Sequence, residues 1–148
     1  MPALQDPREE TITYFVERFG VERVALLELS FVIGPDDVWA STAAPIEALR
    51  TVRPPGLRAA RRMRGGLKPT STFLRAIGAQ LTASRVEIDD PRGLTQLLLG
   101  HSIDASLSEG YVALSYRGDV LGCGLVKGGR LRAILPAGQR NELLKAIS

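Results

Sequence analysis

The side chains that could contact a polyanion are cationic and fall in two parts of the chain. The first part is a short basic segment that contains Arg58, Arg61, Arg62, Arg64 and Lys68. The second part lies in the C-terminal third and contains Arg117, Lys127, Arg130 and Arg132. A guanidinium group pairs with phosphate in a bidentate geometry and also stacks on bases, so the chemistry offered is contact with a phosphate backbone.

Two mid-strand glycines stand beside the second cationic group. The stretch GYVALSYRGDVLGCGLVKGGRLRAILP, residues 110–136, alternates with period two, which predicts three antiparallel strands joined by compact hairpin turns. If Cys123 faces the core with its apolar neighbours, Gly122 and Gly124 face the other way and leave bare backbone. The same alternation turns Arg130 and Arg132 outward.

Two interpretations fit this pattern. In the first, the bare strip and the adjacent cations seat a phosphate backbone. In the second, the glycines relieve curvature in a small barrel and the arginines are solvated.

The charge distribution is more informative than the net charge of +3. Residues 1–47 carry a net charge of −6, residues 48–86 carry +9 without a single carboxylate, and residues 87–148 are neutral. A basic window of this length predicts one strongly positive surface, which is typical of proteins that bind a polyanion.

The elements that must position these groups are predicted from caps and periodicity. Asp6 and Pro7 begin a helix that ends at Gly20, and Asp90 and Pro91 begin another that ends at Gly100. Further helices are expected over Val21–Leu27, Pro45–Val52, Ser71–Ile77 and Gly138–Ile147. Strands are expected over Ser30–Ile33, Val38–Ser41 and Arg85–Ile88, and the segment from Leu57 is either a basic strand or a loop.

The order and spacing of residue types from Gly110 onward resemble those of a known family. The pattern consists of Gly110, Tyr111, Tyr116, Gly118, Leu121, Gly122, Gly124, Gly129, Arg130, Leu131, Arg132, Pro136 and Arg140. It is similar to the C-terminal PUA-like RNA-binding domain of Sun/Fmu-type rRNA cytosine methyltransferases, over roughly residues 83–140. One departure is Ala133, where these methyltransferases usually carry Asn, so an RNA contact through that Asn would be missing here.

The N-terminal half does not resemble a methyltransferase. It has no strand followed by a Gly-rich loop for adenosylmethionine, and the single thiol, Cys123, lies in a predicted mid-strand core position. Its layout resembles small archaeal proteins with an α+β pre-PUA module followed by a PUA domain. The resemblance implies an α+β fold, with an N-terminal module over 1–82 and a PUA-like small β-barrel with flanking helices over 83–148.

Several classes of site are not predicted. No apolar run is long enough for a membrane span, no secretory signal is visible, and one Cys and one His cannot form a zinc site. His101 has no nucleophile placed with it, and Asp89 and Asp90 are expected to cap a helix. We therefore expect a cytoplasmic protein with no catalytic residues, no metal and no cofactor.

These features favour a non-catalytic protein that binds structured RNA, either rRNA or tRNA, in ribosome biogenesis or RNA modification. The predicted contacts are Arg58, Arg61, Arg62, Arg64, Lys68, Gly100, Arg117, Gly122, Gly124, Lys127, Arg130 and Arg132. The alternative is a protein-interaction subunit, whose acidic N-terminal part docks on a ribosomal protein or on an RNA-modifying enzyme such as a methyltransferase.

Overall fold

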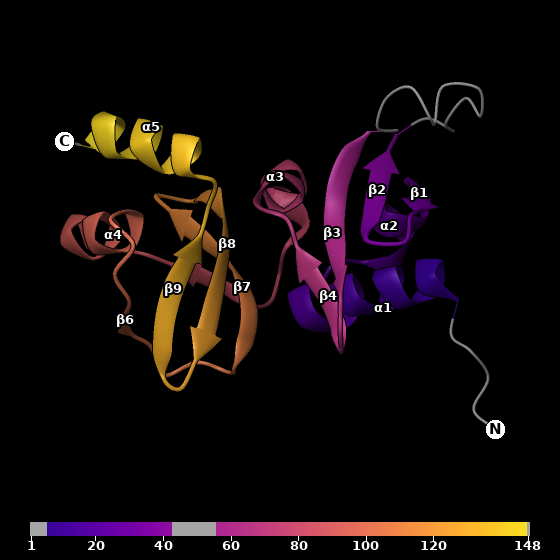
Figure 1. The fold of residues 1–148 in the computed structure, drawn as a ribbon, viewed down its shortest axis with the longest axis horizontal. Helices are drawn as coiled ribbons and strands as arrows, with labels where there is room; N and C mark the ends of the chain where they lie inside the picture. The colour runs from indigo at the N-terminus through magenta and orange to yellow at the C-terminus, as the bar shows by residue number, and fades with distance from the viewer. Residues whose placement is uncertain (1–5, 43–55, 148) are drawn as a thin grey trace.

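The computed structural model describes residues 6–42 and 56–147. The helix predicted over Pro45–Val52 lies outside the described residues. Two sheets flank a short helix at the middle of the molecule, with α1 and α2 at one side and α4 and α5 at the other (Figure 1).

The first two helices begin and end near the predicted residues. Helix α1 (Pro7–Phe19) starts after Asp6, whose carboxylate accepts a hydrogen bond from the Arg8 N–H at 3.1 Å. It ends at Gly20, whose φ of 65° is the left-handed conformation that terminates many helices. Helix α2 (Arg23–Leu27) follows at once and packs against α1.

A four-stranded antiparallel sheet follows in the order β1-β2-β3-β4. Its strands are β1 (Ser30–Ile33), β2 (Asp37–Ser41), β3 (Leu57–Met63) and β4 (Gly66–Pro69). The basic segment from Leu57, for which the sequence allows either a strand or a loop, is therefore a strand. Strand β4 was not predicted, because it is short and carries both Gly and Pro; its position at the sheet edge tolerates Pro69.

The second sheet has five strands in the order β5-β7-β8-β9-β6 and curls into a half-barrel (Figure 1). Its strands are β5 (Arg85–Glu87), β6 (Ile103–Asp104), β7 (Gly110–Tyr116), β8 (Asp119–Lys127) and β9 (Arg130–Ile134). Helix α3 (Ser71–Ala76) and the 3-10 turn Gly78–Gln80 lead into it, α4 (Pro91–Leu98) follows β5, and α5 (Ala137–Ile147) ends the chain. The predicted meander β7-β8-β9 and the predicted PUA-like α+β fold are confirmed; the parallel pairing of β5 with β7 was not foreseen.

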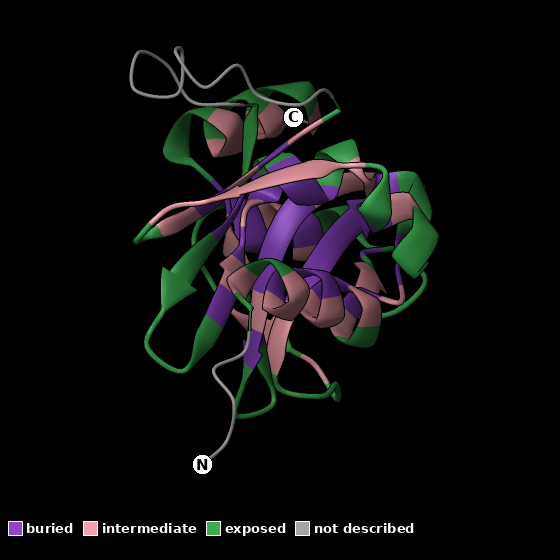
Figure 2. Ribbon diagram, turned by 90° about the vertical axis from the view of Figure 1, so that its right-hand side faces the viewer, coloured by how far each residue is buried: buried purple, intermediate pink, exposed green. Residues whose placement is uncertain are grey.

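Two main hydrophobic clusters stabilise this arrangement. One fills the half-barrel, where Leu114, Val126 and Leu131 pack against α4 and α5. The other lies between the two sheets and joins Phe15 and Phe73 with Ala113 and Cys123 of the half-barrel. The buried residues accordingly gather at the centre of the molecule in Figure 2, while the hairpin turns at its periphery are exposed. The division into modules at residue 82 stays a prediction, and the second cluster contains residues from both sides of it.

Candidate nucleic-acid interface

The predicted bare strip at Gly122 and Gly124 is wrong, because both glycines are buried. A Cβ at Gly124 would lie 2.9 Å from Leu114 Cδ2, inside the half-barrel. A Cβ at Gly122 would lie 2.3 Å from Leu135 Cδ2 and 2.7 Å from Ser71 Cβ. These glycines therefore make room for neighbouring protein groups. This agrees better with a role in the architecture of the barrel than with a strip that contacts a phosphate backbone.

Helix α3 makes use of the space that Gly122 leaves. The Ser71 hydroxyl at the start of α3 accepts a hydrogen bond from the Cys123 N–H at 2.9 Å and donates one to the Ile134 carbonyl at 2.8 Å. Cys123 and Ile134 face each other across β8 and β9, so the hydroxyl bridges the two strands. No local pattern marks this role, since a Ser at the first position of a helix is ordinarily solvated.

Three of the predicted cations do come together on the half-barrel. Lys127, Arg130 and Arg132 line a concave surface of about 300 Å³ with Ser102 and Leu125, which we call the barrel hollow. Strand β9 keeps the predicted alternation: Leu131 is buried, whereas Arg130 and Arg132 are exposed on the opposite face. Within the described residues, neither Lys127 nor Arg132 has a hydrogen-bond or ion-pair partner for its side chain.

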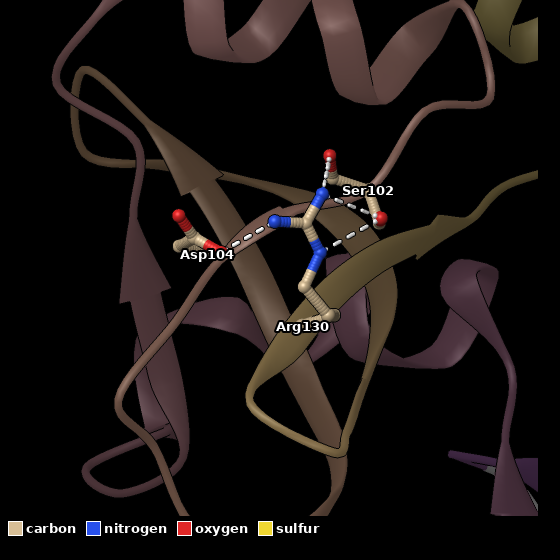
Figure 3. Close-up of polar contacts among 3 residues, drawn as sticks. All are labelled: Ser102, Asp104 and Arg130. Atoms are coloured by element: carbon tan, nitrogen blue, oxygen red, sulfur yellow. Dashed lines mark hydrogen bonds and ion pairs between the residues drawn. The ribbon is translucent and has the colours of Figure 1, made fainter.

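Arg130 is held in place by the turn that follows α4 (Figure 3). Its guanidinium donates to the Ser102 carbonyl at 2.8 Å and to the Ser102 hydroxyl from two nitrogens, and it pairs with the Asp104 carboxylate. Because this pair is exposed, it contributes little free energy of unfolding. Its effect is geometric, since it fixes one cation at the rim of the barrel hollow.

A second basic concavity lies where the half-barrel meets the four-stranded sheet. It measures about 420 Å³, and we call it the junction hollow. The residues that line it are Arg58, Arg61, Lys68, Pro69, Thr70, Ser71, Thr72, Ile134, Leu135 and Pro136. Arg61 and Lys68 are direct cross-strand partners on β3 and β4, so they extend from the same face of the sheet.

The other arginines of the basic segment differ in their surroundings. Arg58 packs over the Trp39 ring at 5.2 Å, and its Nε lies 3.3 Å from Asp37 Oδ1. Arg62 donates to the Gly34 carbonyl at 3.1 Å, and Arg64 is exposed in the turn between β3 and β4. The segment therefore presents cations in several directions and not as one cluster.

Two predicted contacts lie apart from these hollows. Arg117 has a φ of 52° in the turn between β7 and β8, where its guanidinium lies 5.2 Å above the Tyr116 ring. That turn is at the opposite end of β8 from Lys127, so the structure does not bring Arg117 together with the barrel hollow. Gly100 is exposed in the turn after α4 with a φ of 92°, and a Cβ there would lie 3.6 Å from the Arg140 guanidinium.

The titratable groups near the half-barrel are tuned by burial and hydrogen bonding. Burial raises the pKa of the Cys123 thiol to about 12, an effect that nearby Lys68 opposes, so the thiol is neutral and unsuited to nucleophilic attack. Burial also raises the pKa of Tyr14 and of Tyr111. A hydrogen bond from the Ser115 hydroxyl, helped by the Gly118 N–H, lowers the pKa of Glu87.

Neither a membrane-spanning helix nor a metal cluster is found in residues 6–42 and 56–147. No helix there combines the length and the apolar character needed to cross a bilayer. No group of three or more His, Cys, Asp or Glu side chains in those ranges could hold a metal ion.

Comparison with known families identifies the half-barrel and its helices. Residues 83–141 match the family model described as the methyltransferase RsmF PUA domain, which confirms the resemblance drawn from the sequence. The match covers β5 to β9, α4 and the start of α5, and residues 1–82 lie outside it. No curated protein matches the chain. A PUA domain is a binding domain and not a catalytic one, so the match indicates that this part of the chain binds RNA.

Proposed function

We propose that this protein is a non-catalytic RNA-binding protein whose partner is a structured RNA, either rRNA or tRNA. The observation that carries the proposal is the barrel hollow, where Lys127, Arg130 and Arg132 converge within the segment that matches the PUA domain. A concave surface with three cations matches the charge and the shape of a phosphate backbone.

The mechanism is docking, in which shape and charge decide the fit and no bond is made or broken. Arg130 is already oriented by Ser102 and Asp104, so it loses little side-chain freedom when it meets a phosphate. Lys127 and Arg132 are exposed and adapt to the ligand. More distant phosphate contacts come from the arginines of β3 and its turn, from Arg117 and from the backbone at Gly100.

The bound RNA would be held in the cytoplasm for ribosome assembly, or for a modification enzyme carried on another chain. Ala133 packs in the barrel cluster on the other face of β9 from Arg130 and Arg132, so its side chain does not reach a base held in the hollow. We therefore expect binding led by phosphate contacts and RNA shape, with weak discrimination among base sequences.

The experiment is a titration of a labelled tRNA transcript with the full chain at several salt concentrations. We expect the logarithm of the affinity to fall linearly with the logarithm of salt, by roughly 0.7–0.9 per phosphate contacted. The K127E/R132E double variant should bind far more weakly, whereas R8E, which makes the same kind of charge change on α1, should bind like the natural chain. No binding at low salt, or a flat salt dependence, would contradict the proposal.

A second candidate function is favoured by the surface of α2. Val24 and Leu27 are 66% and 49% exposed, and the neighbouring Glu22 and Glu28 are exposed as well. An apolar pair beside carboxylates suits a basic protein segment, such as one from a ribosomal protein. Retention of a protein partner after nuclease treatment, and its loss in a V24D/L27D variant, would support this function.

A further inference from the structure

We propose that the junction hollow is a second phosphate-binding site, and that it takes the backbone of the same RNA strand that occupies the barrel hollow. The inference rests on the proposed function, because it assigns a second contact to the same ligand. It adds that the four-stranded sheet, which lies outside the matched PUA segment, is part of the RNA-binding surface.

The junction hollow offers donors that the folded chain leaves unused. Within the described ranges, the side chains of Arg61, Lys68 and Thr72 have no hydrogen-bond or ion-pair partner. The carboxylate of Asp37, which faces Arg61 across β2 and β3, pairs with Arg58. Three cations beside one carboxylate leave an excess of positive charge in a concave site, which favours an anion such as phosphate.

The floor of the junction hollow is rigid. The Ser71 hydroxyl bridges β8 and β9, and the Thr70 hydroxyl donates to the Arg58 carbonyl at 2.5 Å while it accepts from the Phe73 N–H at 3.1 Å. These bonds fasten the start of α3 to both sheets. The cations from β3 and β4 are therefore held at a fixed position relative to β9, as a binding site requires.

Strand β9 connects the two hollows along one face. Arg130 and Arg132 line the barrel hollow, and Ile134, the next residue on that face, lines the junction hollow. At about 3.4 Å per residue, Arg130 and Ile134 are roughly 14 Å apart along the strand. One extended strand of RNA lying over β9 can therefore reach both hollows.

The lining also indicates which part of the RNA is bound. The apolar residues of the two hollows are Leu125, Ile134, Leu135 and two prolines, and neither lining contains an aromatic ring. Stacked bases usually rest on aromatic side chains, whereas sugars and phosphates do not need them. The contact is therefore with the sugar–phosphate backbone, and the bases point away from β9.

The test compares charge-reversal variants of the full chain in binding to the labelled tRNA transcript. We expect K68E and R61E each to lower the affinity roughly tenfold at moderate salt and to reduce the salt slope by about one, as loss of one phosphate contact predicts. The control is R8E, and R132E reports on the barrel hollow separately. If K68E and R61E bind like R8E while R132E binds weakly, the junction site is refuted and the proposed function stands.

A second measurement uses the unmodified protein, so that its result does not depend on whether the variants fold correctly. Titration with inorganic pyrophosphate, followed by amide NMR, should shift the resonances of Lys68 and of residues 70–72 before those of α1. Absence of these shifts, together with unchanged RNA binding by K68E, overturns the inference. If no variant, R132E included, alters RNA binding, the proposed function itself fails.

Discussion

Strands β8 and β9 are neighbours in one sheet, yet the face that was predicted to be open is exposed in β9 and covered in β8. In β9, Leu131 is buried and the arginines on either side of it are exposed, as predicted. In β8, the glycines that were expected on the outer face are buried, and Cys123 packs toward the first sheet. The two residue types therefore act differently. The glycines of β8 make room for neighbouring protein groups, whereas the arginines of β9 are exposed.

The reason for the difference is that both faces of β8 are covered, one by the half-barrel cluster that Gly122 and Gly124 face and the other by the cluster that contains Cys123. An irregularity in the pairing of β7 with β8 also places Leu121 on a different face from the predicted one. Leu114 pairs with Gly122, but the next residue, Ser115, pairs with Val120, so Leu121 has no partner opposite it. A bulge of this kind shifts the faces on which the following residues lie. Leu121 therefore packs with the barrel cluster on the same side as Leu114, and the alternation cannot be extended across it.

The largest effect is expected where β8 meets α3. Gly122→Ala places a Cβ against Ser71 and Leu135 at a residue whose φ is 154°. Overpacking and backbone strain together should lower the free energy of unfolding by about 3 kcal/mol, a loss of roughly 10 °C in Tm. The control is Gly138→Ala in α5, where a Cβ meets nothing within 4 Å and helix propensity rises. Equal Tm values for the two variants would show that the space beside Gly122 is not filled.

The hydroxyl that bridges β8 and β9 gives the next largest effect. Ser71→Ala removes the acceptor for the buried Cys123 N–H, which should cost about 1–3 kcal/mol because that donor is left unsatisfied. Thr72→Ala, one residue along and exposed, is the matched control. Chemical denaturation of both variants measures the difference, and a Ser71→Ala protein as stable as Thr72→Ala would refute the bridge.

On β9 the corresponding change should alter binding and leave stability intact. Arg132→Glu reverses an exposed charge in the barrel hollow, so RNA affinity should fall roughly tenfold at moderate salt while Tm stays within about 1 °C. Arg130→Glu should weaken binding and also loosen the turn at Ser102, because it breaks that set of hydrogen bonds. Binding curves and amide hydrogen exchange at residues 102–104 distinguish the two arginines; equal exchange there in the two variants would contradict the anchoring role of Arg130.

The smallest effect concerns the carboxylate that holds the irregular end of β8. Glu87 accepts hydrogen bonds from the Ser115 hydroxyl and the Gly118 N–H, which lower its pKa from the ordinary value of 4.5. A lowered pKa in the folded state means that the carboxylate stabilises the fold above pH 4.5, and that this is lost as the pH falls through the folded-state pKa. The Tm of the natural chain should therefore drop more on acidification than that of Glu87→Gln. Parallel Tm curves for the two proteins would contradict this role.

Local signals in the sequence predicted most of the fold but not the way its parts meet. The cap at Asp6, the stop at Gly20 and the hairpins around β8 rest on neighbouring residues, so they could be found without tertiary information. The bulge at Leu121 and the docking of Ser71 depend on residues far apart in the chain, and no local pattern marks them. The cationic residues could likewise be identified from the sequence alone. Their division between the barrel hollow and the junction hollow could not, because it depends on how the two sheets meet.

The cluster that joins Phe15 and Phe73 to Ala113 and Cys123 has a consequence for how the chain comes apart. No layer of solvent separates the two halves at these residues, so neither half can melt without exposing apolar surface of the other. Buried contacts of this kind make unfolding cooperative. Amide protons at the centre of α1 and of β8 should therefore exchange with solvent through one common global opening, at closely similar free energies.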